Sequence, residues 1–353
     1  MYIVYSEEHK LHDPPYEFLD GRLSPYHESP RRAEIIREAL IEAGIGTFIE
    51  PRSFGLEPLV AVHSPALLAY YESIYDRWVA AGGAPEGVMP SSFAVRWMHQ
   101  FSPDALSEPG YYCFDLSAVI TATTYPAIRA SANCALTGAA LLLEGQRSAY
   151  ALCRPPGHHA GRDLYGGYCF LNNVAIAAEY LLRQSGAGRA QRPKAAILDI
   201  DFHHGNGTQQ IFYERDDVFF VSIHADPERH YPYYLGSVNE RGSGSGEGTT
   251  LNFPLEKGIT NDRYLDVLDQ ALLPIAEYDP DWLLISAGFD TYEGDPVAQN
   301  DFALTTEVYA EIGARIAALG LPTLHVQEGG YAVEQLGLNV VSYLRGFLSG
   351  AAS

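Results

Sequence analysis

Seven short apolar runs, separated by stretches with helical periodicity, constrain the fold of this chain more than any other feature. The runs lack the regular apolar–polar alternation of a half-exposed strand, so we expect each to be buried on both faces. Strands that alternate with helices pair in parallel, which predicts an α/β fold with a mostly parallel central sheet sandwiched by helices. Ligands then belong at the carboxyl ends of the strands. The predicted strands are Tyr2–Tyr5, Ala149–Cys153, Ala195–Asp199, Val218–Ile223, Thr249–Phe253, Trp282–Ser286 and Thr323–Val326.

The pattern continues along the whole chain, so we expect residues 1–353 to form one domain. Residues 82–110 do not follow it, because Gly, Pro and Ser are mixed there with the aromatic residues Phe93, Trp97 and Phe101. We interpret this segment as a long structured loop inserted into the domain, and such loops are often functional.

Composition narrows the class of protein. Lys and Arg number 23 against 44 Asp and Glu, and the resulting net charge of −21 argues against nucleic-acid binding. No apolar run is long enough to cross a bilayer, and the first residues do not resemble a signal peptide. The four cysteines include no C-x-x-C pair, which favours a reducing compartment. We therefore expect a cytoplasmic protein whose acidity either keeps it soluble or attracts cationic substrates.

The densest chemistry follows the third predicted strand, where Asp199, Asp201 and His203 are spaced by two. Continued strand geometry would place these three side chains on one side of the chain. Two carboxylates beside a buried strand need a compensating cation or hydrogen-bond donors, and a divalent metal supplies that compensation. A cluster held by salt bridges or by helix capping is the alternative.

Asp290 ends another strand and would be a third metal ligand, although an aspartate taken alone at such a place is more often a helix N-cap. With Asp201 and His203 it would leave one position open for water and substrate, as catalytic zinc requires. Zn²⁺ and Fe²⁺ both suit such ligands.

Two further segments present polar side chains after strands. His158 and His159 lie in a loop stiffened by prolines and glycines, which suits general acid–base catalysis. Tyr331 follows a glycine pair, and its hydroxyl could donate a hydrogen bond to a developing oxyanion. A packed turn aromatic is the simpler interpretation of Tyr331 alone.

Together these segments make the chain resemble the zinc-dependent histone deacetylase superfamily, with its arginase/deacetylase fold, and most of all the bacterial acetylpolyamine amidohydrolases. The resemblance extends over nearly the whole chain. Its motifs are Tyr5-Ser-Glu-Glu-His-Lys, Gly110-Tyr-Tyr-Cys, Arg154-Pro-Pro-Gly-His-His-Ala-Gly, Gly166-Gly-Tyr-Cys-Phe-Leu-Asn-Asn, Asp199-Ile-Asp-Phe-His-His-Gly-Asn-Gly and Glu328-Gly-Gly-Tyr.

The resemblance implies hydrolysis of acetylated amines to acetate and free amine, with a role for each site residue. Asp201, His203 and Asp290 would bind the metal, His158 and His159 would form the catalytic pair, and Tyr331 would polarise the carbonyl. Asp199 would orient His158 and, with Ser222, border a structural K⁺ site. Asn206 would be the partner of His159.

Substrate binding is also implied. Tyr168, Tyr231 and Gly167 match positions that line the narrow tunnel of the family, and residues 82–110 match a loop that builds a homodimer. Acids near the tunnel mouth would bind the distal amine of a small cationic substrate. The candidates are Glu86, Asp104, Glu108 and Asp115, while Ser117 stands about where an acid is expected.

Three other functions compete with this expectation. A class II-like protein lysine deacetylase would share the whole site. A non-catalytic acyl-amine binding protein would be expected to lack Tyr331 or a metal ligand, and none is missing. An arginase-like ureohydrolase would need more metal-bridging carboxylates than these strand ends provide.

Overall fold

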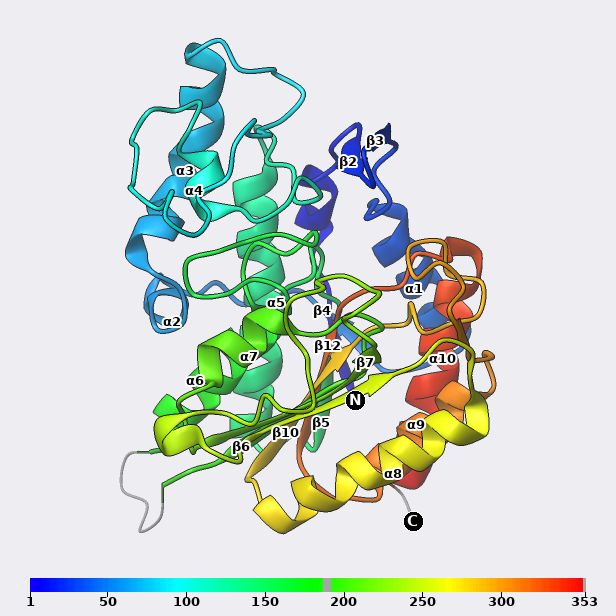
Figure 1. Ribbon diagram of the computed structural model, residues 1–353. Helices are drawn as coiled ribbons and strands as arrows, with labels where there is room; N and C mark the ends of the chain where they lie inside the picture. Colours follow the sequence, from blue (N-terminus) through cyan, green and yellow to red (C-terminus); the bar gives the residue numbers. More distant parts are fainter. Residues whose placement is uncertain (187–191, 352–353) are drawn as a thin grey trace.

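A single eight-stranded parallel sheet forms the centre of the computed structural model, which describes residues 1–186 and 192–351 (Figure 1). Its strand order is β4-β1-β5-β12-β10-β6-β7-β8. The strands are β1 (Tyr2–Val4), β4 (Thr47–Ile49), β5 (Ser148–Ala151), β6 (Ala195–Asp199), β7 (Val218–Ala225), β8 (Thr250–Leu255), β10 (Trp282–Ala287) and β12 (Thr323–Gln327).

Helices cover both faces of this sheet, and successive residues of each strand pack into different cores. In β6, for example, Ile197 packs into one core and Leu198 into the other. The first core includes α2 (Glu57–Val60), α3 (Pro65–Ala80), α4 (Pro109–Tyr112), α5 (Thr124–Leu143), α6 (Asn173–Ser185) and α7 (Asn206–Phe212). The second includes α1 (Arg31–Glu42), α8 (Asn261–Tyr278), α9 (Val308–Ala317) and α10 (Val333–Gly350), which Figure 1 shows on the opposite side.

Several helices begin and end at residues suited to those positions. The Ser64 hydroxyl caps α3 by accepting a hydrogen bond from the Leu67 N–H at 3.2 Å, and Pro65 follows as the first helical residue. Asn172 caps α6 by accepting from the Ala175 N–H at 3.0 Å. After α9 the chain turns at Gly320, which has a φ of +67°.

The remaining regular elements are short. A hairpin of β2 (Glu17–Leu19) and β3 (Arg22–Ser24) stands at one end of the carboxyl edge of the sheet, above α1 in Figure 1. Strands β9 (Ile259–Thr260) and β11 (Phe302–Ala303) form a parallel pair, and η1 (Glu7–Leu11) and η2 (Gly244–Gly246) are 3₁₀ turns.

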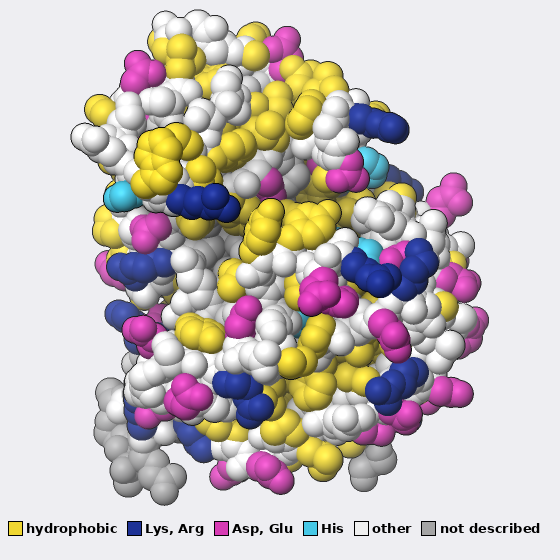
Figure 2. Space-filling model, viewed as in Figure 1, with side chains coloured by type: hydrophobic (Ala, Val, Ile, Leu, Met, Phe, Trp, Pro, Cys, Tyr) yellow, Lys and Arg dark blue, Asp and Glu magenta, His cyan; other side chains and the backbone are white. Residues whose placement is uncertain are grey.

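The chain between α3 and α4 contains no helix or strand among its described residues, apart from isolated bridges. Phe93 packs against the first core, whereas Trp97 is 81% exposed and Phe101 is 45% exposed. Figure 2 shows hydrophobic side chains gathered over this upper part of the molecule.

The predicted fold is confirmed: one α/β domain with a parallel sheet between helical layers. All seven predicted strands are present, within one or two residues at their ends. The prediction omitted the edge strand β4 and the hairpin β2–β3, whose three-residue strands are too short for a periodic signal. Within the described ranges, no helix is both long enough and apolar enough to cross a membrane.

Candidate active site

Four neighbouring strands, β5, β12, β10 and β6, carry the residues expected to form the site. Each strand ends at the same edge of the parallel sheet, so the loops that follow them meet there. The loop after β5 carries His158 and His159, that after β6 carries Asp201 and His203, that after β10 carries Asp290, and that after β12 carries Tyr331.

Asp199, Asp201 and His203 do converge, but not by the strand alternation that we expected. Strand β6 ends at Asp199, and the next residues form a turn. The Asp199 carboxylate accepts a hydrogen bond from the Asp201 N–H at 3.1 Å, and Asp201 accepts one from the His203 N–H at 2.9 Å. Each acid therefore binds the backbone two residues further on, which is the ordinary local preference of aspartate outside a strand.

Asp290 joins this group and does not cap a helix. One of its carboxylate oxygens accepts a hydrogen bond from the Phe202 N–H at 2.8 Å, and the other lies 3.0 Å from His203 Nδ1. Burial and the nearby Asp201 carboxylate raise the pKa of Asp290 to about 7.

Two glycines allow these carboxylates to lie deep in the protein. A Cβ at Gly288 would lie 2.0 Å from Asp201 Oδ2, and one at Gly329 would lie 2.5 Å from Asp290 Oδ2. Any other residue at either position would displace the acids. The Gly329 N–H also donates to Asp201 Oδ2 at 2.8 Å.

The group formed by Asp201, His203 and Asp290 fits a divalent metal. One donor atom from each lies within 4.8 Å of the others, and all three residues are buried. The imidazole Nδ1 of His203 faces both carboxylates. Two buried carboxylates side by side repel each other, and a cation between them would remove that cost. Two oxygen donors and one imidazole nitrogen suit Zn²⁺ or Fe²⁺.

The paired histidines have different hydrogen-bond partners. His158 Nδ1 lies 2.9 Å from Asp199 Oδ2, and His159 Nδ1 lies 2.7 Å from Asn206 Oδ1. Burial acts to lower the pKa of His158, but the Asp199 and Asp201 carboxylates outweigh it and raise the pKa to about 10. Burial and the neighbouring histidines hold the pKa of His159 well below its usual value. His158 thus favours the charged form and His159 the neutral form.

Tyr331 faces the cavity from beneath a buried arginine that the sequence analysis missed. The Arg32 guanidinium lies 4.7 Å from the centre of the Tyr331 ring and donates hydrogen bonds to the carbonyls of Gly330 and Glu328, at 2.6 and 2.7 Å. Glu28 pairs with Arg32 at 2.7 Å. Arg32 lies in the first turn of α1, far away in the sequence, so no local pattern could have linked it to Tyr331.

A cavity of about 220 Å³ opens in front of these residues. The three expected tunnel residues, Tyr168, Tyr231 and Gly167, all line it, together with His159, His203 and Tyr331. Asp20 also lines it, from the turn of the β2–β3 hairpin, and this acid was missed as well. The Asp20-Gly21 dipeptide was a readable hairpin signal, but nothing in it indicated that the turn faces the cavity.

Three of the four candidate acids for a distal amine lie outside the cavity lining, and their role stays a prediction. Glu108 pairs with Arg77 at 2.6 Å, Asp104 accepts a hydrogen bond from the Leu106 N–H at 2.9 Å, and Glu86 is exposed. Asp115 does line the cavity, as does Ser117 beside it. Ser222, expected at the K⁺ site, is paired with Asp199 across β6 and β7, and its hydroxyl lies 2.8 Å from His224 Nδ1.

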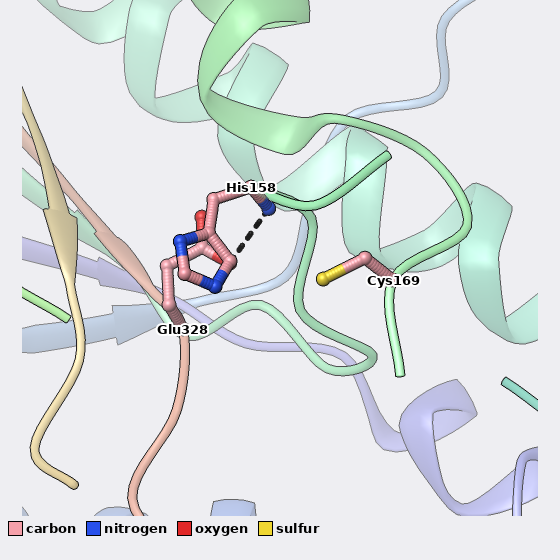
Figure 3. Close-up of side chains that lie close together, drawn as sticks. All are labelled: His158, Cys169 and Glu328. Atoms are coloured by element: carbon pink, nitrogen blue, oxygen red, sulfur yellow. Dashed lines mark hydrogen bonds between the residues drawn. The ribbon is translucent and has the colours of Figure 1, made fainter. Parts of the chain in front are cut away.

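Figure 3 shows a second buried group whose donor atoms lie close together, His158, Cys169 and Glu328. One Glu328 oxygen accepts hydrogen bonds from the N–H groups of Gly157, at 2.7 Å, and His158, at 3.2 Å. Burial raises the pKa of Glu328 to about 7 and keeps the pKa of the Cys169 thiol well above its usual value. The hydrogen bonds from the Gly157 and His158 N–H groups connect Glu328 to the loop that carries the histidine pair, so this acid helps to hold that loop in place.

A parallel α/β sheet with two aspartates, one histidine and a histidine pair at its carboxyl edge defines a class of hydrolases that can hold a divalent metal. The model of the histone deacetylase domain matches residues 26–347. Acetylpolyamine amidohydrolase 1 of Pseudomonas aeruginosa is 48% identical over the whole of both chains. The acetylpolyamine amidohydrolase of Mycoplana ramosa is 43% identical over 98% of this chain and 99% of its own.

A solved structure supports the same family. The crystal structure of acetylpolyamine aminohydrolase from Burkholderia pseudomallei superimposes with a TM-score of 0.92 at 38% identity, covering 99% of each chain. The chain belongs to the histone deacetylase family.

Proposed function

We propose that this protein is a metal-dependent amidohydrolase that removes acetyl groups from acetylpolyamines. The observation that carries the proposal is the cavity of about 220 Å³, whose lining combines Asp20 and two tyrosines with His159, His203 and Tyr331. An exposed acid in the lining of a cavity with aromatic walls suits a cationic alkyl chain. The relatives named acetylpolyamine amidohydrolase, similar over their full length, support the same substrate class.

Asp201, His203 and Asp290 would hold the metal, which we infer to be Zn²⁺, with Fe²⁺ as the other ion suited to these donors. Such an ion polarises an amide carbonyl and lowers the pKa of water.

His159 is the proposed general base. Its Nδ1 faces the oxygen of the Asn206 amide, so Nδ1 carries the proton and Nε2 has the free lone pair. The lowered pKa keeps His159 neutral at pH 7 and able to accept a proton from the attacking water. His158, charged through Asp199, stabilises the negative charge that develops in the site.

Tyr331 would donate its phenolic proton in a hydrogen bond to the developing oxyanion. The raised pKa of Tyr331, which burial causes, keeps the phenol protonated. The leaving amine then takes up the proton that His159 accepted, which gives acetate and the free amine.

The methylene chain of the substrate would lie between Tyr168, Tyr231 and Gly167, with about 0.8 kcal/mol of stabilisation for each methylene buried. Asp20 would receive the distal ammonium group. The lone pairs of Asp115 are already occupied, since it accepts four hydrogen bonds.

Three further features belong to the proposal. Asp199 and Ser222 border a K⁺ site that stabilises the end of β6.

Exposed Trp97 and Phe101 form part of a homodimer interface that narrows the tunnel entrance. The four cysteines are free thiols, which supports a cytoplasmic location.

A competition assay tests the substrate class. N-acetylputrescine, N⁸-acetylspermidine and an acetyl-lysine peptide are mixed with the metal-loaded enzyme, and the release of each amine is followed. We expect the two acetylpolyamines to be consumed first. Preferential hydrolysis of the peptide would instead identify a class II-like protein lysine deacetylase, and no hydrolysis of any amide would indicate a binding protein.

A further inference from the structure

The carboxylate of Asp115 connects two separate segments of the cavity wall. Its Oδ2 accepts hydrogen bonds from the Gly167 N–H and from the Tyr231 hydroxyl, each at 2.8 Å. Its Oδ1 accepts from the N–H and the hydroxyl of Ser117, at 3.1 and 3.0 Å. Four donors therefore hold this half-buried acid, and they leave no lone pair free for a ligand.

The two segments joined by Oδ2 both contact His159. Gly167 belongs to the loop before α6, and Tyr231 to the loop after β7. The Tyr231 ring packs edge-on against the His159 ring, with centroids 4.9 Å apart and an interplanar angle of 84°. A Cβ at Gly167, where φ is +56°, would lie 2.4 Å from His159 Cδ2 and 2.7 Å from the Tyr231 hydroxyl. Gly167, Tyr231 and His159 are thus in direct contact.

Among the residues that the structure describes, Asp115 is the only hydrogen-bond partner of the Tyr231 hydroxyl, so its carboxylate determines how closely the ring approaches Gly167. A charge-assisted hydrogen bond between two half-buried side chains is stronger than one in water. Without it, the ring would be free to turn away from Gly167, and the cavity would widen beside His159.

We propose that Asp115 is a positioning residue that holds Tyr231 against Gly167, fixes the width of the cavity beside His159, and so restricts the reaction to slender, unbranched alkyl amides. This inference rests on the proposed function, because a fixed width selects substrates only if the acyl amine passes this wall. Asp115 does not touch the reacting atoms; it acts through Tyr231 and Gly167.

The test is the ratio of kcat/KM for N-acetylputrescine to kcat/KM for an acetyl-lysine peptide, measured on the metal-loaded enzyme. Tyr231→Phe keeps the ring and removes only the bond to Asp115, and Asp115→Asn weakens the same bond from the other side. We expect each to lower the ratio about tenfold, the size of one hydrogen bond to a charged group, mainly through a higher KM for N-acetylputrescine. The double variant should fall no further, because both changes break one connection.

Tyr343→Phe is the matched control. It also removes a buried tyrosine hydroxyl, which lies 2.9 Å from His325 Nδ1 in the second core and does not line the cavity. We expect it to lower the unfolding midpoint and to leave the substrate ratio unchanged. An unchanged ratio in Tyr231→Phe, or an equal fall in Tyr343→Phe, would overturn the inference.

A crystal structure of Tyr231→Phe separates this inference from the proposed function. We expect the phenyl ring to lie further from Gly167 than the tyrosine ring does, whatever the substrate is. A ring in the unchanged position would refute the positioning role even in an active deacetylase, whereas a wild-type enzyme that ignores N-acetylputrescine would refute only the proposed substrate.

Discussion

His158 and His159 are adjacent in the sequence but differ in their electrostatic surroundings. A carboxylate partner favours the imidazolium form of His158, whereas the uncharged Asn206 amide leaves His159 neutral under the influence of burial and of nearby cations. Two imidazoles with pKa values moved in opposite directions can serve as a charge stabiliser and a base at the same pH. The different hydrogen-bond partners of the two Nδ1 atoms therefore give the two histidines different proposed roles.

Tyr331→Phe tests the proposed oxyanion donor. The substitution keeps the ring beneath Arg32 and removes only the hydroxyl, so we expect kcat to fall about 10²-fold with a small change in KM. Steady-state kinetics on N-acetylputrescine measure both constants. A large rise in KM at unchanged kcat would mean that Tyr331 lines the cavity without stabilising the transition state.

His63 gives a prediction about stability. Its Nδ1 lies 2.9 Å from the Gly161 carbonyl and its Nε2 accepts a hydrogen bond from the Asn172 N–H at 2.9 Å, so the neutral form is required. Burial lowers the pKa of His63 to about 4, from 6.5 when unfolded. Its contribution is therefore complete above pH 6.5 and is lost as the pH falls toward 4.

Between pH 7.5 and pH 5 this amounts to about 2 kcal/mol. Urea unfolding of the wild type and of His63→Gln at both pH values isolates the effect, because the titrating carboxylates are common to both proteins. We expect the wild type to lose that much more stability than the variant on acidification. Parallel losses would show that His63 does not titrate on unfolding.

At the scale of single residues, the sequence predicted the metal-binding group and the histidine pair better than it predicted the other residues around the cavity. The metal-binding group and histidine pair follow strands with clear apolar runs, so their common edge could be inferred. Asp20 and Arg32 could not be inferred in this way, since they reach the cavity through contacts between segments distant in the sequence. The spacing argument for Asp201 and His203 gave the right neighbours for the wrong reason, as the turn replaces the strand there.

The long strands of the central sheet and the short β2–β3 hairpin differ in how well they could be predicted from the sequence. The long apolar strands were predictable because burial on both faces leaves a continuous hydrophobic signature. The hairpin β2–β3 has only three residues in each strand and is held partly by a backbone bond from Phe18 to Leu116, at 3.5 Å. Its position depends on tertiary contacts, which a local pattern does not encode.

The segment between α3 and α4 gives the element-scale prediction. If its exposed aromatics form a dimer interface, Trp97→Ser and a variant with residues 95–101 replaced by a short glycine–serine linker should both favour monomers, with increased hydrolysis of bulky acetylated peptides. Sedimentation velocity measures the assembly state.

Leu273→Ser is the control for that experiment, because Leu273 is 65% exposed but lies on α8, in the other helical layer. We expect it to leave the assembly state unchanged. A wild-type monomer at micromolar concentration would disprove the interface and would leave the catalytic assignment intact.

For the molecule as a whole, the net charge of −21 has either an electrostatic role in substrate capture or only a solubilising one. If it attracts cationic substrates, kcat/KM should fall as salt rises from about 0.01 to 0.15 M, since the Debye length shrinks from about 30 to 8 Å. A neutral acetamide of similar length should respond little.

Asp20→Asn should remove most of the salt response for the cation and raise its KM, while Glu86→Gln makes the same charge change outside the cavity and should have little effect. The kinetics of the three proteins with both substrates give the comparison. Equal salt responses for cationic and neutral substrates would favour a purely solubilising charge.

Metal removal tests the central claim, which is that Asp201, His203 and Asp290 hold a divalent ion on which amide hydrolysis depends. The protein is exhaustively chelated, its residual metal content is measured by elemental analysis, and hydrolysis of N-acetylputrescine is assayed before and after Zn²⁺ is returned. We predict loss of activity in the metal-free protein and recovery with one equivalent of Zn²⁺. Full activity in a protein verified to be metal-free would contradict the account.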